Sequence, residues 1–186
     1  MKKIVLTGGT YCGKTKLWNI LKDEYPGFHF VEDPAMVAIQ AQQELEKTKA
    51  GYTGIFPWNN SKFFEPLVLA KSLILESQIP DGPGVAIFDT SLIDRLAYCK
   101  IRDHESLIPE ISEHIKSANY DLAFMLDPIK PYKENSYRRE TESQADLTYS
   151  VIRDTYKNAN IKVIEVPNFG VIDDRVAYFI KESAKF

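Results

Sequence analysis

The glycine-rich segment from Gly8 to Thr15 constrains the fold of this chain more than any other feature. It reads Gly8-Gly9-Thr10-Tyr11-Cys12-Gly13-Lys14-Thr15 and fits the pattern G-x-x-x-x-G-K-[ST] at every fixed position. A short apolar run precedes it, and apolar residues at helical spacing follow it. A strand, a glycine turn and a helix in this order direct backbone N–H groups toward a phosphate. The sequence therefore predicts a phosphate-binding loop.

Each fixed type of residue in this pattern has a chemical reason. Gly8 and Gly13 permit backbone angles and close approaches that a side chain would block. Lys14 offers a positive charge to the outer phosphates of a nucleotide, and the hydroxyl of Thr15 can ligate Mg²⁺. We therefore expect all eight residues of the segment to bind the nucleotide. The alternative is an ordinary glycine-rich turn before a helix.

Composition restricts the chain to a few classes of protein. Its 186 residues suit one domain, here residues 1–186, and its net charge of -3 gives no electrostatic reason to expect nucleic acid as a partner. No segment approaches the roughly 20 apolar residues that span a membrane. Cys12 and Cys99 form neither a disulfide framework nor a metal-binding set, which favours a reducing cytoplasm.

Strand-like and helix-like segments alternate along the whole chain. This alternation predicts an α/β fold of the doubly wound nucleotide-binding type, in which helices cover both faces of a five-stranded parallel sheet. The expected strands are 3–7, 28–31, 85–88, 122–126 and 161–166. The expected helices are 14–23, 35–49, 61–77, 92–102, 109–117, 140–158 and 172–182. The inward-facing residues expected on the second and third helices are Met36, Ile39, Leu45, Phe64, Leu67, Val68, Ile74 and Leu75.

Two carboxylates at strand ends are candidates for catalysis, because ligands of parallel sheets bind beyond the carboxyl ends of the strands. Asp89 follows an apolar strand, as an acidic Mg²⁺ ligand does in P-loop proteins, and we expect it to hold Mg²⁺ together with Thr15. Its alternative role is to cap the next helix. Glu32 follows the second strand and could take a proton from the hydroxyl of an acceptor, or could simply cap a helix. Asp127 receives no role.

A basic segment near residues 128–140 has the composition of a lid. It is polar and proline-broken, and an arginine within it could stabilise a transferring phosphoryl group while closure excludes water. Arg138 and Arg139 are adjacent, so one of them is expected to face the phosphates. The alternative is a solvated basic loop. Arg95 is a second candidate for contact with substrate or phosphate, and its alternative is an ion pair with Asp94 or Glu105 on a helix surface.

The ordered set of these motifs resembles a known family. The chain is similar to the AAA-type ATP-binding domains related to the ribosylnicotinamide-kinase domain of NadR regulators, within the P-loop kinase-like class. The resemblance covers nearly the whole chain. It rests on residues 6–15, 31–34, 57–59, 88–98, 131–132, 134–135, 139 and 163–167. The resemblance implies a three-layer P-loop NTPase fold of the nucleoside- and nucleotide-kinase type. It also implies ATP binding, with phosphorylation of a small nucleoside-like molecule as one activity, and it makes Arg139 the better match for the lid arginine.

Two positions depart from the pattern of related sequences. Thr90 stands where related sequences carry an arginine directly after the acidic residue of the third strand. Ser136-Tyr137 replaces the Asp-Pro that usually follows Glu-Asn in the lid. The first departure weakens the assignment as a standard kinase unless Arg95 or a lid arginine takes over that role.

The sequence thus predicts an ATP- and Mg²⁺-dependent kinase of a small nucleoside-, nucleotide- or nicotinamide-riboside-like acceptor. Lys14, Glu32, Asp89 and Arg139 are its expected catalytic residues, and Glu32, Trp58 and Arg95 are expected at the acceptor. No N-K-x-D sequence occurs, so ATP is expected rather than GTP. The alternative is a nucleotide-dependent regulatory switch that acts through a partner. A ring-forming mechanical ATPase is not expected, and the sequence leaves open whether the chain forms a homodimer.

Overall fold

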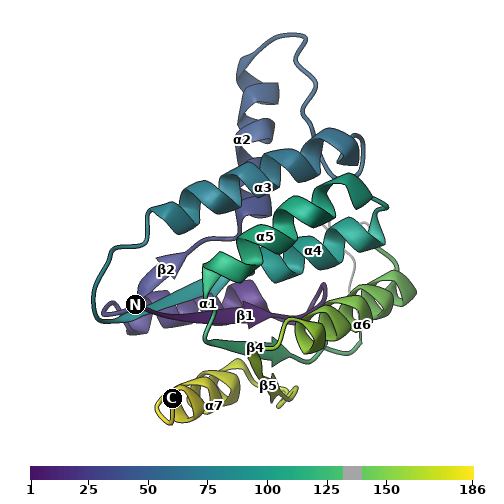
Figure 1. Cartoon of the computed structure of the whole chain (residues 1–186). Coiled ribbons are helices and arrows are strands. Elements are labelled where there is room, and N and C mark those ends of the chain that lie inside the picture. Colours follow the sequence, from purple (N-terminus) through teal and green to yellow (C-terminus); the bar gives the residue numbers. More distant parts are fainter. Residues whose placement is uncertain (132–139) are drawn as a thin grey trace.

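The computed structural model describes residues 1–131 and 140–186. Its centre is a parallel five-stranded sheet in the order β2-β3-β1-β4-β5, which confirms the predicted fold class (Figure 1). The strands are β1 (Lys2–Thr7), β2 (His29–Val31), β3 (Val85–Asp89), β4 (Leu122–Leu126) and β5 (Lys162–Val166). The central strand β1 lies between β3 and β4, so the loop that follows it opens at the middle of the carboxyl edge.

Helices cover both faces of this sheet. They are α1 (Lys14–Glu24), α2 (Pro34–Thr48), α3 (Ser61–Ser77), α4 (Leu92–Ile101), α5 (Ile108–Ala118), α6 (Glu142–Asn158) and α7 (Ile172–Ser183), with a short 3-10 turn at Glu105–Leu107. Side chains alternate along each strand. Val5 therefore packs toward α3, α4 and α6, whereas Ile4 and Leu6 pack toward α1 and α7. Because both faces are buried, β4 is apolar at all five of its positions.

Helix α2 does not lie flat on the sheet. Figure 1 shows it projecting away from the sheet, with the loop that leads to α3 at its tip. Ile39 of α2, Phe64 and Val68 of α3, and Phe56 of the loop form a separate apolar cluster that joins these segments. This cluster, rather than the main core, fixes α2.

Three of the expected inward-facing residues are exposed. Leu45, Leu67 and Ile74 keep 42%, 37% and 50% of their surface accessible, so the prediction is wrong for them. The physical reason is that α2 and the outer side of α3 meet no further layer. Apolar spacing on these helices therefore marks more residues than the structure buries.

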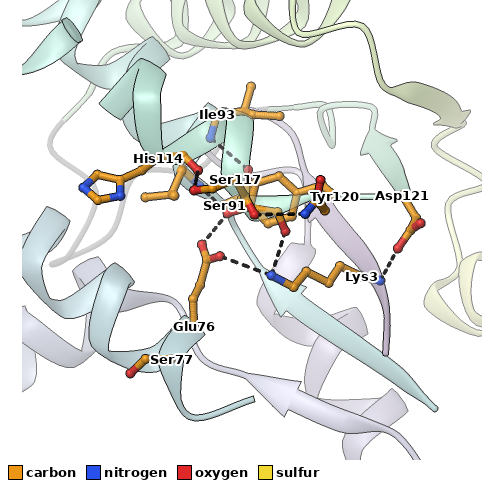
Figure 2. A network of polar contacts seen from close by, with 12 residues as sticks. Lys3, Glu76, Ser77, Ser91, Ile93, His114, Ser117, Tyr120 and Asp121 are labelled. Carbon is orange, nitrogen blue, oxygen red and sulfur yellow. Dashed lines mark hydrogen bonds and ion pairs between the residues drawn. The ribbon is translucent and has the colours of Figure 1, made fainter. Parts of the chain in front are cut away.

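A polar network on the side of the sheet covered by α3 and α4 connects these helices to β1 (Figure 2). The hydroxyl of Tyr120 donates to Glu76 of α3 and accepts from the backbone N–H of Leu92, the first residue of α4, at 3.1 Å. The Nζ atom of Lys3 lies 3.8 Å from Glu76 Oε2 and donates to the carbonyl of Ala118 at 2.7 Å. Burial raises the pKa of Glu76 above its ordinary value. The network fixes the start of α4 relative to the sheet.

A second buried network fixes the same helix from the side of the phosphate loop. Asp94 accepts hydrogen bonds from the hydroxyl of Thr7 at 2.6 Å, the hydroxyl of Tyr156 at 2.5 Å and the backbone N–H of Ser91 at 2.8 Å. Ser91 caps α4 in return, because its hydroxyl accepts from the backbone N–H of Ile93. Asp94 is therefore a structural residue that joins β1, α4 and α6.

We predict that Tyr156→Phe destabilises the protein by about 1–3 kcal/mol, because it removes a hydroxyl donor from a buried carboxylate. Urea denaturation measures the free energy of unfolding. Tyr178→Phe is the matched control on the partly exposed side of α7, and it should change that free energy by less than about 0.5 kcal/mol. Equal effects of the two substitutions would contradict the role given to Asp94.

No helix among residues 1–131 and 140–186 has the length and apolar character needed to cross a bilayer.

An apolar cavity of about 280 Å³ lies at the amino end of the strands, where Ile4, Phe28, Phe179 and Phe186 contribute to its lining. The motifs of the sequence lie at the opposite, carboxyl end. The described residues that line this cavity include no aspartate or glutamate, so we place the candidate site at the carboxyl edge instead.

Candidate functional site

The phosphate loop packs so closely on its neighbours that two of its glycines have no room for a side chain. A Cβ atom on Gly8 would lie 2.6 Å from the carbonyl oxygen of Leu126, and one on Gly9 would lie 2.9 Å from the Cβ of Tyr149 on α6. Gly13, the N-cap of α1, has a left-handed φ of 82°. No side chain in the described part of the chain caps the N-terminus of α1, so its first N–H groups can meet a phosphate.

Lys14 folds back over this loop. Its Nζ donates to the carbonyls of Gly8 at 2.8 Å and Gly9 at 3.3 Å, and it lies 3.5 Å from the Sγ of Cys12. Burial alone lowers the pKa of Lys14, but the surrounding Cys12, Tyr98, Asp89 and Asp94 raise it above its ordinary value overall. Lys14 therefore remains a cation at the mouth of the loop, as the predicted role in phosphate binding requires.

Arg175 holds the loop against the ends of two strands. Its guanidinium, at the start of α7, donates to the carbonyls of Cys12, of Asp127 at 2.8 Å and of Pro167 at 3.1 Å. The residue is 2% exposed. Burial lowers the pKa of Arg175. The Cys12 contact closes the loop itself, and the other two lie where β4 and β5 end.

We predict that Arg175→Met weakens nucleotide binding by about tenfold or more, because three buried carbonyls lose a charged donor and the loop loses its support. Arg175→Lys should recover part of the affinity, since a lysine keeps the charge but cannot span three acceptors. Calorimetric titration with magnesium-ATP measures the dissociation constant, and Arg153→Met on the exposed side of α6 is the control. Unchanged affinity in the folded Arg175→Met variant would contradict this role.

Asp89 ends β3 beside the phosphate loop and is 3% exposed. The hydroxyl of Thr15 interacts with its carboxylate, and its Oδ1 atom has no hydrogen-bond partner among the described residues. Burial, followed by the charge of Asp33, raises the pKa of Asp89 to about 7, against the opposing effects of Lys14 and Thr15. A buried carboxylate with an unused oxygen next to a hydroxyl fits a hard cation such as Mg²⁺.

Thr90, the residue after Asp89, has a φ of 80°, which is unusual for a β-branched residue. Its hydroxyl oxygen is buried and has no partner in the described part of the chain. Strained backbone of this kind often occurs at functional sites. Here the unusual backbone directly follows the candidate metal ligand Asp89.

We predict a pH-dependent difference in stability between the protein and its Asp89→Asn variant. The pKa of Asp89 is about 7 in the folded protein and 3.8 for an ordinary aspartate. Burial of the ionised carboxylate therefore costs no stability below pH 3.8, and this cost grows as the pH rises toward 7. The free energy of unfolding of the variant should therefore rise relative to that of the wild type by up to about 1.4 kcal/mol per pH unit across that interval. Urea denaturation from pH 4 to 8 in chelator measures this, and a constant difference would contradict the raised pKa.

Glu32 and Asp33 are neighbours in sequence but lie in different surroundings. Glu32 is exposed, and its Oε1 lies 3.7 Å from the Nζ of Lys22. Asp33 caps α2, because its Oδ1 accepts from the backbone N–H of Ala35 at 2.8 Å. The charge of Asp33 raises the pKa of both Asp89 and Arg95. The structure thus brings Asp33, and not Glu32, to the candidate metal ligand.

Arg95 and Trp58 lie on the α3 side of the sheet edge. Arg95 is 4% exposed, and its guanidinium lies 4.7 Å from the ring centre of Tyr98. The alternative of an ion pair on a helix surface is therefore wrong, and Asp94 is occupied by the network described above. Trp58 is partly buried and stacks on Phe56 with ring centres 4.9 Å apart.

Both flanks of residues 132–139 contact the phosphate loop. The backbone N–H of Ile129 donates to the carbonyl of Tyr11 at 3.0 Å, and the hydroxyl of Thr10 donates to Glu140. Arg138 and Arg139, the expected lid arginines, lie outside the described residues. The described residues at the start and at the end of the expected lid therefore contact the phosphate loop.

The described residues contain no group of three or more His, Cys, Asp or Glu side chains that could hold a metal ion. A cation at Asp89 and Thr15 would therefore need phosphate oxygens or water to complete its shell. Mg²⁺ is usually bound in this way, by one or two protein oxygens together with substrate phosphates.

Three residues of the site were not found from the sequence. Arg175 follows two aspartates at the start of a helix, a pattern typical of a solvated helix end. Asp33 precedes a proline and reads as a helix cap, which it also is. Glu65 of α3 is 2% exposed and its charge acts on Arg95, but nothing in its spacing along an apolar helix indicates this burial. For Glu65 alone, a charge set among apolar neighbours could have drawn attention to the residue.

The strand, loop and helix, with Lys14 and Asp89 at the carboxyl edge, define a protein with a P-loop fold. The sequence matches the AAA domain family over residues 3–175, and the chain belongs to this family. No curated protein matches the chain.

Solved structures of low identity share the fold. The NadR protein in complex with NR superposes with a TM-score of 0.75 at 18% identity, over 100% of this chain and 51% of that protein. The chain thus spans about half the length of NadR. Deoxyadenosine kinase from M. mycoides gives a TM-score of 0.68 at 13% identity, over 98% of each chain. Thymidylate kinase from Candida albicans gives 0.65 at 16% identity, over 99% of this chain and 92% of that one.

Proposed function

We propose that this protein is an ATP- and Mg²⁺-dependent kinase that phosphorylates a hydroxyl group of a small nucleoside-like molecule. One observation carries the proposal: the buried carboxylate of Asp89, with one oxygen unpartnered among the described residues, lies beside the Thr15 hydroxyl, and the charges of Lys14 and Asp33 both act on it. Phosphoryl transfer depends mainly on positioning and on neutralising charge, and these groups are suited to both.

The loop residues Gly8 to Thr15 bind the triphosphate in this proposal. Their backbone N–H groups and the N-terminus of α1 meet the phosphates, and Lys14 exchanges its contacts with the carbonyls of Gly8 and Gly9 for phosphate oxygens. The structural relative NadR has been solved with NAD and AMP-PNP, which supports nucleotide use by this fold.

Thr15 and Asp89 are the residues that would hold Mg²⁺. Their fit rests on the unpartnered Oδ1 of Asp89 and on the interaction of its carboxylate with the Thr15 hydroxyl. When bound, Mg²⁺ supplies positive charge that offsets the charge of the phosphate oxygens. The cation also requires Asp89 to be ionised, so we expect metal-dependent binding to strengthen as the pH rises through about 7.

Asp33 orients the hydroxyl of the acceptor and takes its proton. Its hydrogen bond from Ala35 fixes the carboxylate at the start of α2, and its charge acts on both Asp89 and Arg95. Residues 128–140 close over the transfer as a lid, anchored at both ends on the phosphate loop. Arg139 is the proposed lid arginine, and Trp58 lines the acceptor region.

We predict that Asp33→Asn lowers kcat by about 10²–10⁴-fold and changes the KM for ATP little, because a general base acts on the acceptor and not on the nucleotide. Glu32→Gln is the matched control at the adjacent, exposed position. Steady-state release of ADP in the presence of an acceptor measures both variants. A larger loss in Glu32→Gln than in Asp33→Asn would return the catalytic role to Glu32.

A panel of nucleosides, nucleotides and related alcohols tests the proposal as a whole. We expect at least one of them to stimulate ADP release well above the rate with ATP alone, and the phosphorylated product to appear in equal amount. Acceptor-independent hydrolysis that responds only to a protein partner would contradict the kinase and support the regulatory switch.

A further inference from the structure

The apolar cavity at the amino end of the strands lies at the opposite end of the sheet from the phosphate loop. Its volume is about 280 Å³. Ile4 of β1, Ile87 of β3 and Phe179 of α7 form its inner wall, and all three are buried. Lys2 and Phe186 also line it, and both are exposed. The cavity therefore reaches from the core to the surface, where the two ends of the sequence lie close together (Figure 1).

The lining of this cavity is mostly apolar. Aliphatic and aromatic side chains, among them Phe28 and Ile180, continue the inner wall toward the surface. The hydroxyl of Ser183 is already used, because it donates to the carbonyl of Ile180 at 3.1 Å. None of the described lining residues has a buried side-chain polar atom without a hydrogen-bond partner. Because a buried water needs two to four polar partners, this lining favours an apolar molecule over water.

Positive charge lies at the surface end of the cavity. Lys2 is the one charged side chain among the described residues that line it. The Nζ atom of Lys2 donates to the carbonyl of Phe186 and lies 5.0 Å from the centre of the Phe186 ring, and the Nζ atom of Lys162 on β5 lies 5.3 Å from the same ring centre.

These two ammonium groups remain available to an anion. Neither Lys2 nor Lys162 forms an ion pair with a carboxylate in the described part of the chain. An ammonium group has three N–H donors, and the described side-chain hydrogen bond of Lys2 uses one of them. The entrance to the cavity therefore favours a negatively charged group.

The volume and the lining together limit the ligand. A cavity of about 150 Å³ between apolar side chains is large enough to hold benzene, so this cavity has room for roughly eight to ten carbon atoms. A nucleotide or a sugar carries more polar groups than the lining can pair, and each unpaired polar group costs affinity when it is buried. The ligand is therefore of a different class from the nucleotide and the acceptor of the proposed kinase reaction.

We propose that this cavity is a binding site for a small apolar carboxylate, a chain or ring system of roughly eight to ten carbon atoms with one carboxylate group. The apolar part lies against Ile4, Ile87 and Phe179. The carboxylate accepts a hydrogen bond from Lys2, and Lys162 adds to the positive charge around it. The site is separate from the phosphate loop and does not depend on the proposed kinase function.

Calorimetric titration of the wild-type protein with octanoate tests the inference. We expect saturable binding of one octanoate per chain. The affinity should be at least about fivefold higher than for octan-1-ol, because the alcohol brings no charge to the ammonium of Lys2. It should be at least about tenfold higher than for butyrate, because octanoate buries more methylene groups. Absence of saturable binding by folded protein, or equal affinity for octanoate and octan-1-ol, would overturn the inference.

Two variants test the position of the ligand. We expect Lys2→Gln to weaken octanoate binding by about fivefold or more and to leave octan-1-ol unaffected. Ala184→Phe should weaken both by about tenfold or more, because Ala184 lines the cavity and the added ring occupies its space. Lys47→Gln on the exposed side of α2 is the control for the loss of a lysine. Unchanged octanoate affinity in either folded variant would contradict the assignment.

Magnesium-ATP separates this site from the nucleotide site. We expect octanoate to bind in the presence of saturating magnesium-ATP, because the cavity and the phosphate loop lie at opposite ends of the strands. Displacement of octanoate by magnesium-ATP would place it at the phosphate loop and overturn the inference. Octanoate binding by a protein that phosphorylates no acceptor would support the cavity site and leave the kinase function contradicted on its own.

Discussion

The close approach of the phosphate loop to its surroundings is the constraint on which the rest of the site depends. Gly8 meets the backbone of β4, and Gly9 meets α6, at distances that exclude any side chain. Arg175 then holds the loop to the carbonyls at the ends of β4 and β5. Because the loop is fixed to the sheet in this way, Lys14 and Thr15 have defined positions relative to Asp89. The geometry of the site follows from packing at the centre of the sheet.

Buried polar networks extend this rigidity to the acceptor side. Asp94 connects β1, α4 and α6, while Glu76 and Tyr120 connect α3 to the start of α4. These contacts hold α4, and α4 carries Arg95. Rigid support of this kind is what phosphoryl transfer requires, since its catalysis comes from positioning charges that are already oriented. The proposed division between a phosphate end and an acceptor end therefore has a structural basis in two separate sets of contacts.

Much of the fold could be predicted from the sequence because its signals are local. Apolar runs bounded by Asp89 or by the turn near Gly82 define buried strands, and the motif ending at Lys14-Thr15 defines the first loop and helix. The prediction for Leu45, Leu67 and Ile74 was wrong because apolar spacing identifies a face but does not say whether another layer covers it. That information depends on α2 projecting from the sheet, which only long-range packing determines.

The candidate site was only partly predictable, for a related reason. The loop residues and Asp89 lie next to recognisable strand ends, so their neighbourhood follows from topology. Glu32 and Asp33 are adjacent, and a difference of one residue at the end of a strand decides which of them faces the site. Arg175 is about 160 residues away from the loop that it holds. Glu65 and Arg95 come together only because α3 and α4 pack side by side. Such contacts depend on tertiary packing, so the spacing of residues in the sequence does not predict them.

Calorimetric titration of the protein with magnesium-ATP is the most direct test of the central claim, which is that the loop from Gly8 to Thr15 binds the triphosphate of a nucleotide. The account predicts saturable binding of one nucleotide per chain, tighter for ATP than for GTP, and a loss of affinity of tenfold or more in a folded Lys14→Ala variant, as expected from losing a charged contact. Absence of binding by well-folded protein, or equal affinity in the Lys14→Ala variant, would contradict it.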